Sequence, residues 1–281
     1  MKPINKLIHG DAFAVLKKID DDFVDLGITS PPYNKGEKHK GWLVKNVKYN
    51  VAIDNIPEKD YQNQQAEVLN EIFRITKPGG SFFYNHKTRW ANGVMIHPME
   101  WLSKTRWTVK QEIIWDRAIA ANIRGWRFWQ IDERINWLYK PIGDNQIGEE
   151  LQSRHALLTS IWRFPPERKN GHPAPFPLIL PARIIYSIMN DNKGIVLDPY
   201  VGSGTTCLAA KLLGSDYIGI DVSRDYIKDA EFRLKNYLSY RNKINEEIIK
   251  HIVVKTFSDR KNNNENTGKY RNNITSQEKL L

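Results

Sequence analysis

The residues best suited to chemistry in this 281-residue chain lie in the run Thr29-Ser30-Pro31-Pro32-Tyr33-Asn34. Two consecutive prolines fix φ, and neither ring nitrogen can donate a hydrogen bond. The Ser30 hydroxyl and the Pro31 carbonyl are acceptors for an amino group, and Tyr33 offers a ring face to a planar base. The run therefore predicts either a binding loop for an aromatic amine or a strand-ending turn with a buried tyrosine.

A second candidate site is the glycine-rich run Leu197-Asp198-Pro199-Tyr200-Val201-Gly202-Ser203-Gly204-Thr205-Thr206. It reads as a strand, a tight turn and a helix start, an arrangement that brings free N–H groups close to a ligand. Nineteen residues after Gly202, another apolar run ends in Asp221, whose carboxylate suits ribose hydroxyls. Cys207 occupies the third glycine position of a dinucleotide fingerprint, and no Lys-Ser/Thr follows the glycines as in a phosphate-binding P-loop. The pattern predicts a site for an adenosine-containing cofactor.

Short apolar runs alternate with stretches of helical periodicity, and this alternation predicts a wound α/β sheet of about seven strands. The expected strands are Lys6 to His9, Val24 to Thr29, Ser81 to Tyr84, Gln111 to Trp115, Ile135 to Tyr139, Gly194 to Asp198 and Tyr217 to Asp221. The expected helices are Phe13 to Ile19, Tyr61 to Ile75, Leu178 to Met189 and Thr205 to Leu213. Both candidate sites then lie at the carboxyl ends of strands, where wound sheets bind ligands.

Two segments fall outside this alternation. Residues 141 to 171 lack clean periodicity and are rich in Arg, Lys, Pro and Gly, so we expect an inserted lobe or loop beside the sheet. Residues 241 to 281 are predicted to form a basic helix followed by a polar, disordered tail. The main domain is therefore expected to span residues 1 to 240.

Composition narrows the class of protein. A formal net charge of +10 and a pI near 9.4 favour a polyanionic partner, although a surface charged for solubility would look the same. The single cysteine excludes an internal disulfide and a multi-cysteine zinc site, and we expect no metal in the site. The N-terminus has no apolar leader and no run is long enough to cross a membrane, so we expect a soluble, cytoplasmic protein without a membrane partner.

Taken together, TSPPY and LDPYVGSGTT resemble the amino-methyltransferase family of DNA-modifying enzymes. The catalytic run precedes the cofactor run, as in the β-type, circularly permuted group. Further motifs match in the expected order, and the resemblance covers about residues 5 to 235. They are Gly10-Asp11-Ala12, Lys77-Pro78-Gly79-Gly80-Ser81, Ile113-Ile114-Trp115-Asp116, His172-Pro173-Ala174-Pro175-Phe176-Pro177 and Tyr217-Ile218-Gly219-Ile220-Asp221.

The resemblance implies a Rossmann-like fold, S-adenosylmethionine as cofactor, and specific site residues. The implied catalytic residues are Ser30, Pro31, Pro32 and Tyr33, and the implied cofactor-binding residues are Asp11, Ala12, Asp198, Pro199, Tyr200, Gly202, Gly204, Thr205 and Asp221. Residues 172 to 177 would precede a helix that covers the methionine end of the cofactor, and residues 141 to 171 would form the insertion that recognises the DNA sequence. Two positions depart from the usual pattern: Tyr200 replaces Phe, and Phe176 replaces a Lys found in many relatives.

The implied reaction is methylation of an exocyclic amine of a base, which must leave the helical stack to be reached. TSPP followed by an aromatic residue most resembles the cytosine-N4 group, and adenine N6 is the closest alternative. Two other hypotheses are a cofactor- or DNA-binding subunit without catalysis and a nicotinamide-dependent dehydrogenase. Cys207 lies after the glycine-rich turn and is expected to be a buried packing residue rather than a nucleophile.

Candidate DNA contacts are basic residues interleaved with aromatic ones, which suit phosphate contact and base stacking, although such aromatics are equally often part of a core. They are Lys38, Lys40, Arg124, Arg127, Arg163, Arg168 and Lys169. The expected partner is double-stranded DNA, with a cognate restriction endonuclease as a further candidate. We expect a monomer or a homodimer.

Overall fold

The structure, a computed structural model, describes residues 1–34, 55–120, 125–143, 159–167, 176–189, 193–251 and 262–264. Its centre is an eight-stranded sheet with the strand order β1-β10-β9-β2-β3-β7-β6-β8. The strands are β1 (Lys6–His9), β10 (Asp216–Asp221), β9 (Ile195–Asp198), β2 (Val24–Thr29), β3 (Thr76–His86), β7 (Asp132–Tyr139), β6 (Thr108–Asp116) and β8 (Ile161–Arg163). The predicted α/β sheet is confirmed, with one strand more than the seven expected.

Strand direction decides which loops share an edge. The five neighbouring strands β1, β10, β9, β2 and β3 are parallel to one another, whereas β7 runs antiparallel to both β3 and β6. The carboxyl ends of β10, β9, β2, β3 and β6 therefore meet at one edge, and β7 begins there. We call this edge the catalytic edge, because the loops that follow β2 and β9 contain both candidate sites.

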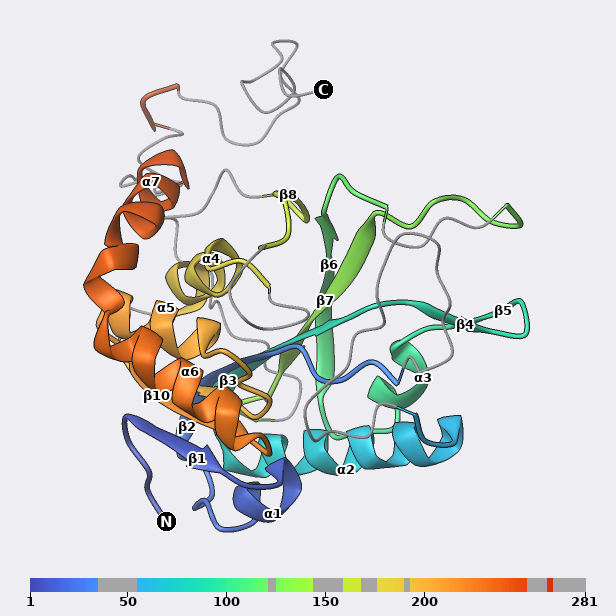
Figure 1. Cartoon of the computed structure of the whole chain (residues 1–281), viewed down its shortest axis with the longest axis horizontal. Coiled ribbons are helices and arrows are strands. Elements are labelled where there is room, and N and C mark those ends of the chain that lie inside the picture. Colours follow the sequence, from blue (N-terminus) through green and yellow to red (C-terminus); the bar gives the residue numbers. More distant parts are fainter. Residues whose placement is uncertain are drawn as a thin grey trace.

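Helices cover both faces of the sheet and divide the core into two layers (Figure 1). One face is covered by α1 (Ala12–Leu16), α2 (Glu58–Ile75) and α3 (Met99–Leu102). The other face is covered by α4 (Ile179–Ile188), α5 (Thr205–Leu213), α6 (Arg224–Lys235) and α7 (Arg241–His251), with a short 3-10 helix at Tyr237–Tyr240. Both faces of the central strands are thus buried, which explains why they read as continuous apolar runs.

Helix α7 packs onto α4. Arg183 and Glu247 form an ion pair in which both residues are buried, and Ile244 of α7 belongs to the core of the same face. A buried guanidinium needs such a carboxylate partner. The tail beyond α7 lies almost entirely outside the described residues. Among those described, no helix is long and apolar enough to cross a membrane.

The helix boundaries follow local chemistry. The Asp11 carboxylate accepts a hydrogen bond from the main-chain N–H of Ala14 at 2.9 Å and caps α1, which ends at Leu16 rather than at the expected Ile19. Helix α2 ends at Ile75 as expected, but β3 begins at once with Thr76 instead of Ser81. Residue Gly79, with φ near +84°, makes the local turn inside that strand.

Two elements depart from the sequence-based expectation. Residues 161–163, assigned to an inserted loop, form β8 and pair in parallel with β6. A two-stranded hairpin, β4 (Arg89–Ala91) and β5 (Val94–Ile96), had not been predicted. Its turn is Asn92-Gly93, both at positive φ, which is a strong hairpin signal that the sequence did contain.

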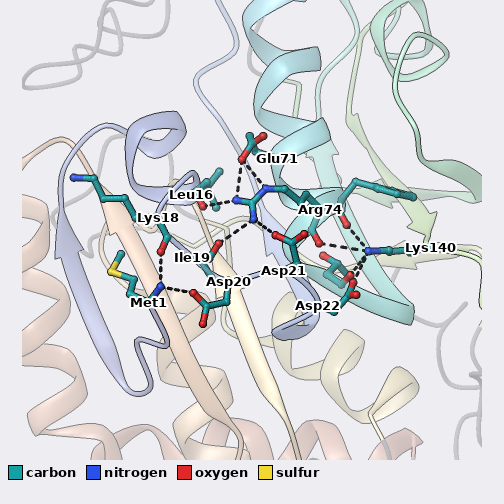
Figure 2. A network of polar contacts seen from close by, with 12 residues as sticks. Met1, Leu16, Lys18, Ile19, Asp20, Asp21, Asp22, Glu71, Arg74 and Lys140 are labelled. Atoms are coloured by element: carbon teal, nitrogen blue, oxygen red, sulfur yellow. Dashed lines mark hydrogen bonds and ion pairs between the residues drawn. The ribbon is translucent and has the colours of Figure 1, made fainter.

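The edge opposite the catalytic one is tied together by a polar network around Arg74, near the end of α2 (Figure 2). The guanidinium donates hydrogen bonds to the Asp21 and Glu71 carboxylates and to the main-chain carbonyls of Leu16 and Ile19. These contacts join α2 to the turn between α1 and β2. They hold the amino end of β2 in place, so that the loop at its carboxyl end has a fixed base.

Candidate active site

The two candidate runs meet where the order of the strands reverses. Strands β9 and β2 are neighbours, with Leu26 opposite Val196 and Gly27 opposite Leu197. From β9 the chain crosses one face through α5, whereas from β2 it crosses the other face through α2. Connections that leave in opposite directions mark the switch point of a wound sheet, which is the usual place of its ligand crevice.

Asp198, at the end of β9, joins the two runs. Its carboxylate is buried and accepts 2.6 Å hydrogen bonds from the hydroxyls of Thr29 and Thr206, and a 3.1 Å bond from the main-chain N–H of Tyr200. Burial raises the pKa of Asp198 to about 6, although these hydrogen bonds oppose the rise. Asp198, which was predicted to bind the cofactor, therefore holds the two loops together through hydrogen bonds to both.

The glycine-rich turn is shaped by close contact with α6. Gly204 has φ +83°, and a Cβ at this position would lie 2.7 Å from the Ala230 Cβ, so a larger residue would not fit. Arg233, also on α6, donates hydrogen bonds to the Ser203 carbonyl at 2.7 Å and to the Thr205 hydroxyl at 3.0 Å. Arg233 thus supports the turn from α6, and the first N–H groups of α5, which have no partner within their own helix, lie at the catalytic edge.

Asp221 and Asp11 lie beside this turn. The Asp221 carboxylate accepts hydrogen bonds from the main-chain N–H groups of Gly202 at 2.9 Å and Ser223 at 2.8 Å. Burial raises its pKa. The main-chain N–H of Gly10 donates to the Asp221 carbonyl at 2.9 Å, which places Asp11 and Ala12 next to the end of β10. The structure therefore brings together the residues predicted for cofactor binding, including the buried Pro199 and the half-buried Tyr200.

The catalytic run turns its tyrosine inward. Tyr33 is 6 % exposed, and its ring centroid lies 4.5 Å from that of His86. The Tyr33 hydroxyl contacts the Ser30 Oγ at 2.6 Å, donates to Glu133 Oε2 at 3.0 Å and accepts a hydrogen bond from Asn85 at 2.9 Å. In this conformation the Tyr33 ring offers no open face, which favours the buried-tyrosine alternative over a preformed base platform.

The same network sets the role of Ser30. Because the single Tyr33 hydroxyl proton goes to Glu133, the Ser30 hydroxyl must donate its own proton to Tyr33. Ser30 Oγ also accepts a 3.4 Å hydrogen bond from Asn85, which leaves one lone pair as an acceptor for an incoming amine. Pro31 is buried and Pro32 is half-buried, which keeps the loop rigid.

A second set of contacts fixes Pro32. Its carbonyl accepts a 2.7 Å hydrogen bond from the hydroxyl of Tyr61, and this hydroxyl also lies 2.7 Å from His86 Nε2. Burial raises the pKa of Tyr61 well above its usual range, so the phenol keeps its proton at neutral pH. Asn34, the next residue but one, exchanges hydrogen bonds with the main chain of Ile56 at 2.8 and 2.9 Å.

Two of the basic residues predicted to contact DNA can be placed. Arg163, on β8, is about half exposed, and its Nε donates a 2.8 Å hydrogen bond to Asp116 Oδ2 at the end of β6. Arg127 lies with its guanidinium 4.1 Å from the Trp90 ring centroid. The other five, Lys38, Lys40, Arg124, Arg168 and Lys169, lie outside the described residues, as do residues 172 to 175.

Sequence reasoning missed several supporting residues. Asn85 and Glu133 hold Tyr33 from β3 and β7, and Arg117 neutralises Glu133 through a 3.1 Å contact. Their only sequence signal is that they are polar residues at strand ends that meet at the catalytic edge. Cys207, by contrast, is fully buried as predicted, and burial raises its thiol pKa well above the usual value, so it is not a ready nucleophile.

Comparisons with known proteins point to one family. A model of the DNA methylase family that covers N6 and N4 methyltransferases matches residues 24–232. The type II methyltransferase M.ScaI of Streptomyces caespitosus is 26% identical, over 82% of this chain and 81% of its own. The DNA adenine methyltransferase YhdJ of Escherichia coli is 29% identical, over 79% and 80%.

Solved structures agree with this result. A DNA modification methylase from Thermus thermophilus in complex with S-adenosyl-L-methionine has a TM-score of 0.59 and 25% identity, with coverage of 83% of this chain and 95% of that one. The cytosine-N4-specific PvuII DNA methyltransferase has a TM-score of 0.65 and 17% identity, over 87% and 93%, and shares the fold.

Proposed function

The chain belongs to the family of DNA methylases, and we propose that it transfers a methyl group from S-adenosylmethionine to the N4 amine of cytosine in duplex DNA. The observation that carries the proposal is the 2.6 Å hydrogen bond between Thr29 and Asp198, which couples the catalytic run to the glycine-rich turn. A methyl donor on one loop and an amine on the other would face each other across the crevice. Such prealignment supplies much of the rate in a transfer reaction.

The cofactor is proposed to lie along the carboxyl ends of β9 and β10. The free N–H groups at the start of α5 and the carboxylate of Asp198 suit the zwitterionic methionine end, whose sulfonium and ammonium groups are cationic. Asp221 suits the ribose hydroxyls, because its oxygens retain lone pairs beyond those used by Gly202 and Ser223. Asp11 and Ala12 border the adenine side. The solved Thermus relative contains the same cofactor.

The proposed chemical step is a direct displacement. The amine nitrogen attacks the methyl carbon; the N–C bond forms as the S–C bond breaks, the bonding pair stays on sulfur, and the nitrogen then releases one proton to solvent. The lone pair of an exocyclic amine is delocalised into the ring, so hydrogen bonds from its N–H groups to Ser30 Oγ and the Pro31 carbonyl would localise it on nitrogen. The arrangement of Tyr33 and Glu133 supports Ser30 as that acceptor.

The choice of base rests on Ser30. TSPP followed by an aromatic residue resembles the cytosine-N4 group, and a neutral hydroxyl replaces the Asp or Asn more frequent in adenine-modifying relatives. Adenine N6 is the second candidate, favoured by the 29% identity to an enzyme named an adenine methyltransferase. The order of the two runs along the chain supports the β-type permutation, and the type II relative supports a restriction-modification role with a cognate nuclease.

A single assay tests the proposal. Purified protein is incubated with unmethylated DNA and S-adenosylmethionine carrying a labelled methyl group, and the DNA is digested to nucleosides that are separated by mass. We expect label in N4-methylcytosine, and none with the Ser30→Ala variant. Label in N6-methyladenine alone would transfer the proposal to the second base, and unlabelled DNA would contradict catalysis altogether.

A further inference from the structure

The segment between β6 and β7, residues 117–131, lies at the catalytic edge, because β6 ends there and β7 begins there. We call residues 125–131 of this segment the aromatic loop; residues 121–124 lie outside the described part of the chain. Figure 1 shows this loop and the β4–β5 hairpin projecting from the same side of the molecule. Neither has a role in the proposed methyl transfer.

The aromatic loop exposes three large rings to solvent. Phe128 is 99% exposed, Trp129 is 63% exposed and Trp126 is 56% exposed. Exposure of a phenylalanine ring to water is unfavourable relative to its burial, so a partner that covers Phe128 would gain binding free energy. Adjacent exposed rings form an apolar patch, which indicates an interaction surface, whereas single scattered apolar residues do not.

These rings are presented on an anchored support. Trp126 packs edge-on against Trp90 of the hairpin, with centroids 6.4 Å apart, and the guanidinium of Arg127 lies 4.1 Å from the Trp90 ring centroid. The buried side chain of Gln130 donates a 3.2 Å hydrogen bond to the carbonyl of Thr88. Phe128 therefore projects from a loop whose neighbours on both sides are fixed.

Polar contacts connect the end of the aromatic loop to the catalytic run. The main-chain N–H of Arg117, which follows β6, donates a 2.9 Å hydrogen bond to the carbonyl of Ile131, which precedes β7. The Arg117 guanidinium contacts Glu133 at 3.1 Å, and Glu133 in turn accepts the hydrogen bond from Tyr33. A movement of the aromatic loop that shifts Arg117 would therefore change the position of Tyr33, through the Arg117–Glu133 ion pair and the Tyr33–Glu133 hydrogen bond.

We propose that Phe128 is a wedge that enters the base stack of duplex DNA at the position vacated by the target base. The inference rests on the proposed function, since only a base that leaves the stack leaves a space to fill. Exposed Phe side chains carry out this role in proteins that unstack DNA. DNA fits better than a protein surface because Phe128 is the most exposed of the three rings, the Arg127 guanidinium donates a 3.2 Å hydrogen bond to the Phe128 carbonyl, and the chain carries a formal charge of +10.

The test uses two synthetic duplexes that contain the methylated position, once this has been mapped by sequencing. In one duplex the target base is normally paired, and in the other it lies opposite an abasic position, which lowers the cost of flipping. We expect Phe128→Ala to slow single-turnover methylation of the paired duplex by about 10- to 100-fold, the factor that corresponds to a few kcal/mol of unstacking. The abasic duplex should be methylated at nearly the wild-type rate.

Two matched variants complete the design. Phe128→Leu keeps an apolar wedge and should restore most of the rate on the paired duplex. Phe232→Ala removes a ring that is 69% exposed on α6, and should change neither rate. Equal slowing of both duplexes by Phe128→Ala, or no slowing of either, would overturn the wedge.

The same measurements separate this inference from the proposed function. A wild-type protein that methylates neither duplex contradicts the proposed function. An active wild type whose rates are not changed by Phe128→Ala contradicts the wedge alone. Analytical sedimentation of the wild type and of Phe128→Ala tests whether a second copy of the chain, rather than DNA, covers the aromatic loop. A dimer that dissociates only in the variant, with equal rates on both duplexes, would assign the surface to a second copy of the chain and overturn the proposal.

Discussion

The Thr29 hydroxyl donates a 2.6 Å hydrogen bond to Asp198 Oδ1, although 169 residues separate the two along the chain. Both residues are 1% exposed and end adjacent parallel strands. A buried hydrogen bond to a carboxylate is stronger than a neutral one and is costly to leave unmade. This contact is therefore the mechanical link between the two halves of the proposed site.

Thr29→Val removes the hydroxyl and keeps the volume of the side chain. We expect the pKa of Asp198 to rise further above about 6, because the hydrogen bond from Thr29 lowers it. Cofactor binding, measured by calorimetry across pH, should then weaken at a higher pH than in the wild type, since a protonated Asp198 no longer attracts the cationic methionine end. If cofactor affinity depended on pH in the same way in Thr29→Val and in the wild type, the Thr29 hydroxyl would not control the pKa of Asp198.

A control for this variant lies at the opposite edge of the sheet. Arg74→Ala breaks the network of Figure 2 and leaves the carbonyls of Leu16 and Ile19 without their guanidinium donor. The free energy of unfolding should fall by about 1–3 kcal/mol. Cofactor affinity at a temperature where the variant is folded should stay at the wild-type value, because no group of the site is touched.

Asp198 also predicts how stability depends on pH. Its folded-state pKa of about 6 exceeds the ordinary value of 3.8, so its contribution is fully present below about pH 4 and is lost as the pH rises through 6. The difference of about two pH units corresponds to about 3 kcal/mol. Asp221, whose pKa is also raised, acts in the same direction.

The measurement is urea unfolding of wild type and Asp198→Asn at several pH values. The amide cannot titrate, so the stability of the variant relative to wild type should increase by about 2 kcal/mol between pH 4 and pH 7. Both proteins share all other titrating groups, which cancel in the difference. A constant difference across this range would show that Asp198 has an ordinary pKa.

Asp221→Ala tests the ribose assignment. We expect cofactor affinity to fall by about 1–3 kcal/mol, from the loss of charge-assisted hydrogen bonds. The variant also leaves the N–H groups of Gly202 and Ser223 without their acceptor, so stability must be measured in parallel. A matched Asp216→Ala change, at the start of the same strand and distant from the catalytic edge, should leave affinity unchanged. Equal affinities in all three proteins would exclude Asp221 from the site.

The sequence predicted well what depends on neighbouring residues. The seven expected strands and the glycine-rich turn follow from apolar runs, glycines and helix starts that lie close together along the chain. Asp198 and Asp221 were predicted as site residues because both end such runs, and both end strands at the catalytic edge. Helix α1 was placed correctly but ended early, since its final turn was inferred from apolar spacing alone.

What the sequence did not predict depends on distant pairing. Glu133 lies 100 residues from Tyr33, and the two meet only because β7 pairs antiparallel with β3. The three residues of β8 are too few to show periodicity, and they join the sheet because Trp115 and Phe164 pack together beside them. The inward rotation of Tyr33 follows from the same distant polar partners, which no local pattern encodes.

Arg163 carries the last prediction, that the segment containing β8 takes part in DNA recognition. Its side chain is 45% exposed, whereas the side chain of Asp116, its ion-pair partner, is 13% exposed. Arg163→Ala should keep its cofactor affinity, because neither residue belongs to the proposed cofactor site, yet bind duplex DNA more weakly; thermal unfolding measures its stability in parallel. If the guanidinium contacts a phosphate, the slope of log affinity against log salt should fall by about 1. Lys228→Ala, which removes a similarly exposed cation from α6, serves as the matched control and should leave the slope unchanged. Identical slopes for both variants and the wild type would contradict the prediction.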